Sequence, residues 1–384
     1  MVEDKKEKVE EEIPQQERID KLSMELFGKP VKDIKYLLCT NYIHTQLLDE
    51  ELARTGLYQW LNVFNGEVKC PRDVLDYSKY DIVQVNMSKQ DIGTITDIKE
   101  ELGKDSKTRL VLNNDYTTEM WGSTFEQPNV IGREAQAADM IFGTEYYMST
   151  AMTEMTGRTC YIIPHPADVR RLKSLVPVPT RNVISTIWRR YDKNAFIPHF
   201  VARNHGLTTQ LIGFDKNQEP RTWAITPLYD YVFAGTNYFD FCDQMRESKV
   251  VYDPFTFHSY NRAIVDCAAL GVPVVGSNRT QSVNVCYPFT AVDPWDVKAA
   301  REMINKLLTD DEFRNKVVQT AKMNSEFYNH ENSLERYLMA IDREETDKWK
   351  AADKKKRTIL ERGRGDDVNN IIAKGKNREP NKKK

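Results

Sequence analysis

The sequence predicts an α/β protein of two lobes, each a parallel β-sheet covered by helices on both faces. Three observations carry this prediction. The chain has 384 residues, too many for one ordinary core and enough for two domains of about 150 residues each. Short apolar runs alternate with amphipathic stretches, as strands alternate with crossover helices. The proline-spaced segment 176–182 interrupts this alternation and suits a hinge, because proline fixes φ.

The first lobe is expected to span residues 31–177, after a charged lead-in at residues 1–30. Its apolar runs predict strands at 34–40, 80–86, 109–114, 139–144 and 159–164. Helical periodicity predicts helices at 47–61, 95–103 and 130–138. Strands that are apolar along their whole length are typical of a parallel sheet buried on both faces. This lobe is therefore expected to be Rossmann-like.

The second lobe is expected to span residues 178–335 and to repeat the pattern. Its strands are predicted at 182–188, 208–214, 229–235, 248–254 and 272–277. From Trp295 the sequence becomes helical, with a break near Thr309 and Asp310. Residues 336–384 are expected to form a helix and then a disordered basic tail, because the end of the chain lacks apolar periodicity.

Composition excludes several classes of protein. Forty per cent of the residues are hydrophobic, enough for packed cores. The formal charge of -2 gives no overall attraction to nucleic acid or membrane, although residues 343–384 hold fifteen Lys or Arg against eight acids. Six scattered cysteines lack the close spacing of a zinc site or disulfide framework. Without an apolar run of about 20 residues or an apolar N-terminus, the protein is expected to be cytoplasmic with no membrane segment.

The strongest local motif lies at residues 258–278, which read HSYNRAIVDCAALGVPVVGSN. Gly271 suits a helix end and Pro273 the entry to a buried strand. This order resembles the donor-site signature of glycosyltransferases with the two-lobed GT-B fold, especially the large retaining family that uses nucleotide sugars. In that family two glutamates lie eight residues apart, and the second holds the nucleotide ribose. Here Asp266 stands at the second position and His258 at the first.

The resemblance implies a GT-B fold whose two sheets face each other across a cleft, with the donor in the second lobe. Asp266 can accept hydrogen bonds from ribose hydroxyls. His258 is expected to face the donor and contact a sugar hydroxyl or phosphate, the alternative being an incidental loop histidine. The backbone N–H groups of Tyr260, Asn261 and Arg262 begin a helix and are expected to receive the diphosphate. Arg262 adds a positive charge there.

A second motif, STIWRRYDKN, follows the first strand of the second lobe. Arg189, Arg190 and Lys193 resemble the basic residues that clamp the donor diphosphate in the same family, where they stabilise the leaving group. Their spacing is shorter than the usual pattern, and the alternative is a solvated basic turn. Gly213 stands where the next strand of that family often ends in glycine.

In the first lobe, Asn113, Asn114 and Asp115 follow a predicted parallel strand. Ligands bind outside the carboxyl ends of such strands. The two asparagines are candidates for acceptor binding, and Asp115 for orienting or deprotonating the acceptor hydroxyl. The alternative for Asp115 is a helix N-cap. His165 and Asp168, in IIPHPADV, resemble the family's interdomain loop and are expected to be structural.

A narrower resemblance concerns the acceptor. The order of NND, ADMIF, IWRRYDK and EFYNHENS is similar to that in the phage α-glucosyltransferases that modify hydroxymethylcytosine in DNA. The basic C-terminal segment favours a DNA acceptor through phosphate contacts, whereas a solubilising tail is the alternative. A glycine-rich loop is missing after the first strand, where this chain has TNYIHTQ.

These observations predict transfer of a sugar from a nucleotide-diphosphate sugar, expected to be a UDP-sugar, to an acceptor hydroxyl. Retention of configuration is implied only by the resemblance. No DxD-like pair stands at a strand end, so neither a metal nor another cofactor is expected to be required. The competing hypotheses are an inactive binding or scaffold protein, a glycan or small-molecule glycosyltransferase, and an epimerase of the same fold. The sequence leaves the oligomeric state open.

Overall fold

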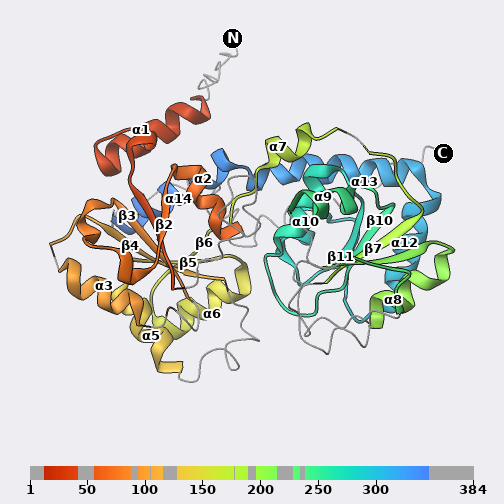
Figure 1. Ribbon diagram of the computed structural model, residues 1–384, viewed down its shortest axis with the longest axis horizontal. Helices are drawn as coiled ribbons and strands as arrows, with labels where there is room; N and C mark the ends of the chain where they lie inside the picture. Colours follow the sequence, from red (N-terminus) through yellow and green to blue (C-terminus); the bar gives the residue numbers. More distant parts are fainter. Residues whose placement is uncertain are drawn as a thin grey trace, which may run out of the picture.

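The protein folds into two lobes that lie side by side, each around its own sheet (Figure 1). The computed structural model describes residues 13–41, 56–87, 91, 93–103, 105–115, 128–176, 178–188, 196–213, 228–233 and 238–345. Each lobe holds a six-stranded sheet whose neighbouring strands are all parallel. The predicted α/β architecture of two parallel-sheet lobes is confirmed.

The first sheet has the order β2-β1-β3-β4-β5-β6. Its strands are β1 (Tyr36–Cys39), β2 (Glu67–Lys69), β3 (Ile82–Asn86), β4 (Arg109–Asn114), β5 (Met140–Gly143) and β6 (Cys160–Ile162). Leu37 and Leu38 of β1 are both fully buried and belong to different apolar clusters, because successive side chains of a strand point to opposite faces. One cluster is covered by α3 (Thr94–Leu102), α5 (Pro128–Ala137) and α6 (Tyr146–Thr156), and the other by α1 (Gln15–Phe27), α2 (Gln59–Phe64) and α14 (His330–Glu345).

The second sheet has the order β12-β11-β10-β7-β8-β9. Its strands are β7 (Val183–Trp188), β8 (Thr208–Gly213), β9 (Tyr231–Phe233), β10 (Val250–Asp253), β11 (Val274–Ser277) and β12 (Ala291–Val292). If β7 is counted as the first strand of the lobe, this order reads 6-5-4-1-2-3, which is a doubly wound sheet. The chain builds one half of the sheet outward from β7 and then the other half outward from β10, so the switch point lies between β7 and β10. Open α/β sheets bind ligands outside the carboxyl ends of the strands at such a switch point.

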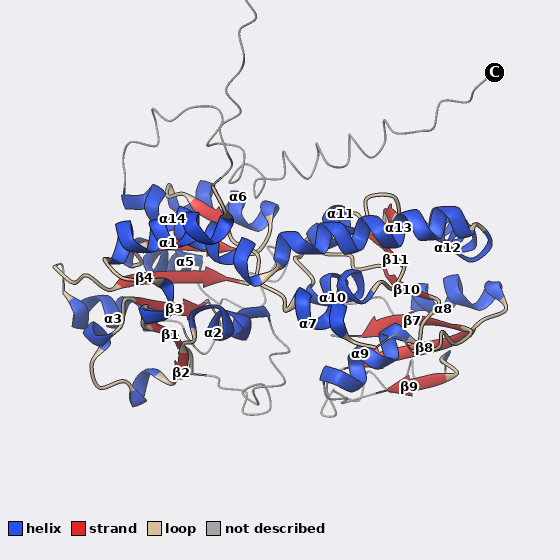
Figure 2. Cartoon of the chain, turned by 90° about the horizontal axis from the view of Figure 1, so that it is seen from above, coloured by secondary structure: helices blue, strands red, loops and turns tan. Residues whose placement is uncertain are grey.

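Helices cover both sheets (Figures 1 and 2). Those of the first lobe are α1 (Gln15–Phe27), α2 (Gln59–Phe64), α3 (Thr94–Leu102), α5 (Pro128–Ala137), α6 (Tyr146–Thr156) and α14 (His330–Glu345). Those of the second lobe are α7 (Val169–Ser174), α8 (Phe196–Ala202), α9 (Tyr238–Arg246), α10 (Arg262–Leu270), α11 (Gln281–Cys286), α12 (Val297–Thr309) and α13 (Asp311–Asn324). The predicted break near Thr309 is confirmed, since Asp310 ends α12 and caps α13 by accepting from the Phe313 N–H at 2.9 Å.

Both ends of the described chain belong to the first lobe. Ile19 of α1 is 1% exposed, and Arg18 pairs with Glu335 of α14 at 2.7 Å, so α1 and α14 pack together (Figure 2). The expected lead-in therefore contains a packed helix, and the expected boundary at residue 335 falls inside α14. Both helices are rich in polar residues, which explains why composition alone predicted loosely attached ends. α1 buries only Ile19 and Ser23, whereas α14 buries most of its residues, including 333–338.

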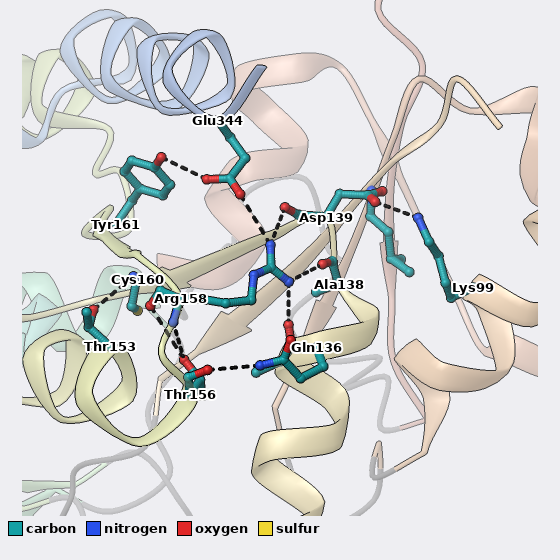
Figure 3. Close-up of polar contacts among 12 residues, drawn as sticks. Lys99, Gln136, Ala138, Asp139, Thr153, Thr156, Arg158, Cys160, Tyr161 and Glu344 are labelled. Carbon is teal, nitrogen blue, oxygen red and sulfur yellow. Dashed lines mark hydrogen bonds and ion pairs between the residues drawn. The ribbon is translucent and has the colours of Figure 1, made fainter. Parts of the chain in front are cut away.

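The last turn of α14 is held by Arg158 (Figure 3). The Arg158 guanidinium donates to the backbone oxygens of Ala135, Ala138 and Asp139, at the C-terminal end of α5, and to the Glu344 carboxylate. The Tyr161 hydroxyl donates to the same carboxylate at 2.9 Å. A cation at a helix C-terminus satisfies carbonyls that have no partner within the helix. Glu344 is thereby fixed on the first lobe, close to where the described chain ends.

Candidate active site

The switch point of the second sheet lies beside the predicted donor motifs. Trp188 ends β7 and pairs with Gly213 at the end of β8, so the carboxyl ends of these two strands lie next to each other. The basic residues Arg189, Arg190 and Lys193 follow β7 directly but lie outside the described residues. On the other side of the switch, β10 ends at Asp253 and leads into the 254–261 loop that precedes α10.

The turn into α10 depends on Asn261, whose φ is 55°. A non-glycine residue in this left-handed region is strained, although asparagine tolerates it better than most residues. Its side-chain amide donates to the Asp253 carboxylate, and its carbonyl accepts from the Ser282 hydroxyl at 2.9 Å. No described group accepts from the backbone N–H of Arg262 or Ala263. The helix therefore begins with free donors at the carboxyl edge of the sheet.

Arg262 and Asp266 form an internal ion pair on α10. Their side chains are 4% and 2% exposed, and Nε of Arg262 lies 2.7 Å from Oδ1 of Asp266. The guanidinium also donates to the Pro166 carbonyl at 3.0 Å and the Tyr238 hydroxyl at 3.2 Å. Burial alone lowers the pKa of Arg262, but the adjacent carboxylate outweighs it and the net shift is upward. These contacts hold the guanidinium in the interior. A nucleotide-sugar donor is therefore expected to contact Arg262 through its backbone N–H.

His258 lies between the lobes. Its ring centroid is 4.0 Å from that of Tyr147, in the first turn of α6. Glu145 places Tyr147 by capping α6, because its carboxylate accepts from the Tyr147 and Met148 N–H groups. Tyr147 is 54% exposed, and no pattern in the sequence marked it as a site residue. The donor motif of the second lobe thus contacts the first lobe through His258.

The predicted acceptor residues gather at the carboxyl end of β4. Asn113 and Asn114 are buried, and the Asn113 amide donates to the Asn86 side chain at 2.8 Å. The side chain of Asp115 is 42% exposed. Its Oδ1 lies 3.4 Å from the Thr144 hydroxyl, and no described group bonds to Oδ2. Asp115 therefore keeps one carboxylate oxygen for a ligand, whereas the alternative role as a helix N-cap concerns residues 116–127, which lie outside the described residues.

His165 lies at the centre of this junction. Its Nε2 is 3.5 Å from Oδ1 of Asp115, and its Nδ1 accepts from the Trp60 indole N–H at 3.3 Å. Its backbone oxygen accepts from the Tyr260 hydroxyl at 2.7 Å, a group that remains protonated because burial raises the pKa of Tyr260. Sequence reasoning gave His165 a structural role and had no means of finding Trp60, 105 residues away.

Asp168, from the same segment, caps α7 by accepting from the Arg171 N–H at 3.1 Å. This contact agrees with the structural role expected of it. Within the described ranges, no three His, Cys, Asp or Glu side chains are grouped so that they could hold a metal ion. In the same part of the chain, no helix is both long and apolar enough to cross a membrane.

Several solved structures share this arrangement of lobes. HepE of Anabaena, solved in complex with UDP-glucose, is 13% identical with a TM-score of 0.58 over 80% of this chain and 99% of that one. An Escherichia coli protein described as trehalose-6-phosphate bound with UDP-2-fluoro glucose is 9% identical, with a TM-score of 0.62 over 81% and 99%. A UDP-forming α,α-trehalose-phosphate synthase of Burkholderia xenovorans is 12% identical, with a TM-score of 0.56 over 76% and 79%.

At these identities the likeness concerns the fold. The chain has the GT-B fold, two Rossmann-like lobes with parallel sheets. No protein-family model matches the chain, and no curated protein matches it in sequence.

Proposed function

We propose that the protein is a glycosyltransferase that moves a sugar from a UDP-sugar to an acceptor hydroxyl. The observation that carries this proposal is the switch point of the second sheet, where the end of β7, which the basic segment follows in sequence, lies next to β10 and the loop that leads to the free N–H groups of α10. Helix N-termini and basic side chains are the groups that bind diphosphates. Solved proteins of the same fold bind UDP-glucose and UDP-2-fluoro glucose, which supports a donor of this class.

On the donor side, the backbone at Tyr260, Asn261 and Arg262 would receive the diphosphate. Arg189, Arg190 and Lys193 would neutralise the charge that develops on it as the sugar leaves, so no metal ion is required. Gly213 ends β8 beside the end of β7, and its lack of a side chain would let the donor approach the strand edge. His258 would contact the sugar, at the point where its ring meets Tyr147.

On the acceptor side, Asp115 would orient the attacking hydroxyl through the oxygen that no described group occupies. Asn113 and Asn114 are the last two residues of β4, directly before Asp115. They would form the base of the acceptor site. Retention of anomeric configuration is part of this proposal, because the sequence resembles a retaining family.

The direct test is a transfer assay with UDP-, ADP- and GDP-sugars against DNA containing hydroxymethylcytosine and against glycan acceptors. Sugar transfer from a UDP donor is expected. Binding of every donor without turnover would instead support an inactive scaffold, and isomerisation of the donor without an acceptor would support an epimerase.

Substitutions in the basic segment test the proposed leaving-group contacts. Arg190→Ala and Lys193→Ala are each expected to lower kcat by about 10² to 10³, as loss of a group that stabilises transition-state charge does. The KM for the donor should change much less, because the interaction strengthens as charge develops. Steady-state kinetics at saturating acceptor measure both constants. A solvated basic turn would leave kcat unchanged in both variants.

We further propose DNA as the acceptor. Support comes from the place where α14 ends, since Arg158 and Tyr161 fix Glu344 on the first lobe (Figure 3). The following residues, 346–384, hold fourteen Lys or Arg against six acids. Their attachment point is thus the lobe proposed to bind the acceptor, and basic segments bind DNA through its phosphates.

A chain that ends after Glu345 tests this proposal while leaving the contacts of Glu344 intact. Its affinity for a duplex containing hydroxymethylcytosine is expected to fall at least about tenfold at 50 mM salt, with a shallower dependence on salt, because fewer counterions are released. Fluorescence anisotropy at 50 and 200 mM salt measures both. Unchanged affinity and slope would identify the tail as a solubilising segment.

A further inference from the structure

The segment that joins the lobes is held from both sides at His165 and Pro166. From the second lobe, the Tyr260 hydroxyl donates to the His165 carbonyl at 2.7 Å and Arg262 donates to the Pro166 carbonyl at 3.0 Å. From the first lobe, Trp60 and Asp115 meet the two ring nitrogens of His165. The imidazole is 3% exposed, and its Nε2 has no hydrogen-bond partner among the described residues.

Gly56 closes the remaining space around the ring. A Cβ at Gly56 would lie 2.4 Å from the Cβ of His165, and 3.0 Å from its Cγ. Contacts below 3 Å force atoms apart in a densely packed interior, where small changes of volume are felt. Only a glycine at position 56 lets the backbone approach the imidazole this closely. The position of His165 is thus determined by this backbone and by the hydrogen bonds of its Nδ1 and its carbonyl.

The partners of His165 determine where its proton lies. An indole N–H only donates, so Nδ1 of His165 must accept from Trp60. The neutral ring then carries its hydrogen on Nε2, which faces Oδ1 of Asp115 at 3.5 Å. Nε2 has no hydrogen-bond partner in the part of the chain that the structure describes, and an N–H···O bond is usually about 2.7–3.2 Å long, so Nε2 and Oδ1 must approach by a few tenths of an ångström for the bond to form. Asp115 would then be oriented by a group whose position depends on both lobes.

We propose that His165 is a positioning residue that couples donor binding in the second lobe to the orientation of Asp115 in the first. A diphosphate at the start of α10 fixes the backbone at Tyr260, whose hydroxyl holds the His165 carbonyl. The imidazole then donates from Nε2 to Oδ1 of Asp115, and Oδ2 is left to meet the acceptor. The role of Asp115 in this inference rests on the proposed transferase function, whereas the coupling itself requires only that a nucleotide binds.

The first experiment follows the indole N–H resonances of ¹⁵N-labelled protein as UDP is added. The Trp60 resonance is assigned by its loss in Trp60→Phe. It is expected to shift on UDP binding in the wild-type chain and to stay in place in Tyr260→Phe, which keeps the backbone and removes only the hydroxyl. The coupling is overturned if the Trp60 resonance does not shift when UDP binds, or if it shifts equally in Tyr260→Phe.

The second experiment separates positioning from a general structural role. His165→Ala is expected to raise the KM for the acceptor about tenfold, the loss expected for one hydrogen bond to a charged group, with the donor dissociation constant unchanged within about twofold. His165→Gln should recover most of this loss, because its amide offers an oxygen to Trp60 and an N–H to Asp115. Arg170→Ala, at a side chain that is 87% exposed, is the matched control and should change neither constant.

A double-mutant cycle completes the test. If His165 acts through Asp115, then His165→Ala in an Asp115→Asn background adds little to the acceptor KM, since coupled residues are non-additive. Additive losses, or equal losses in donor and acceptor binding, overturn the proposal. Failure of the transferase function is seen separately, as absence of transfer from every donor while the UDP-dependent shift of Trp60 persists.

Discussion

Asp266→Ala is expected to lower the free energy of unfolding by about 3–5 kcal/mol, the cost of removing one partner from a buried ion pair. The variant would leave the Arg262 guanidinium, only 4% exposed, with two neutral acceptors in place of a carboxylate. Urea denaturation followed by circular dichroism measures the loss. The size of the effect depends on how completely the pair is buried, which is why it should exceed that of any surface pair in this chain.

The ion pair between Asp266 and Arg262 complicates any test of ribose binding by Asp266. A simple alanine substitution mixes loss of stability with loss of ligand contact, so weaker nucleotide binding alone would prove nothing. Replacing both partners, Arg262→Met with Asp266→Leu, is expected to recover most of the stability, because apolar residues of similar volume often substitute for a buried pair. If Asp266 also holds the ribose, this folded double variant binds UDP more weakly than wild type.

The opposite outcome is equally informative. An Asp266→Ala variant as stable as wild type, with reduced affinity for UDP, would show that the carboxylate serves the ligand and that the ion pair contributes nothing to stability. Asp266→Asn provides an intermediate control, since the amide can still accept from Arg262 but carries no charge.

The sequence predicted the central strands of both sheets and one edge strand of each, β6 and β9. Strands β3, β4, β5 and β10 each contain buried apolar residues on both faces of the sheet, as is typical of parallel strands covered on both sides, although β3 contains Gln84 and β4 ends in Asn113 and Asn114. The other two edge strands, β2 and β12, escaped prediction, since β2 reads Glu-Val-Lys with no residue fully buried, and β12 has two residues. Short, polar edge strands are common, and they leave no apolar run to detect. Strand order was likewise beyond reach, because it is decided by long-range pairing.

The candidate site divides in a similar way. Strand ends could be read from the sequence, so Asp115 and the loop at His258 were placed at the correct edge of each sheet. The partners of the site residues could not be read from the sequence, since His258 contacts Tyr147 and His165 contacts Trp60 across long separations in sequence. The pair on α10 is different. Arg262 and Asp266 are four residues apart on a predicted helix, a spacing that indicates an ion pair, and this signal was available.

Tyr337→Ala is expected to lower the free energy of unfolding by about 3–5 kcal/mol, as deletion of a buried aromatic side chain does. Tyr337 of α14 is fully buried in the first lobe, and its ring centroid lies 4.9 Å from Trp60, 5.1 Å from Phe64 and 4.8 Å from Phe142. Tyr337→Phe should cost about 1–3 kcal/mol, because it keeps the rings and leaves Oε1 of Gln84 without its 3.0 Å hydrogen bond.

Two truncated chains test whether α14 belongs to the core of the first lobe. A chain ending after Glu345 is expected to unfold at the wild-type urea concentration, because all of α14 remains. A chain ending after Glu335 loses Tyr337, Leu338 and Ile341 from the first-lobe core and should fail to form a stable first lobe. If the shorter chain kept the wild-type unfolding midpoint, α14 would be an appendage. If it does not, the helix that follows the second lobe in sequence is a structural part of the first, and the two lobes depend on each other for folding.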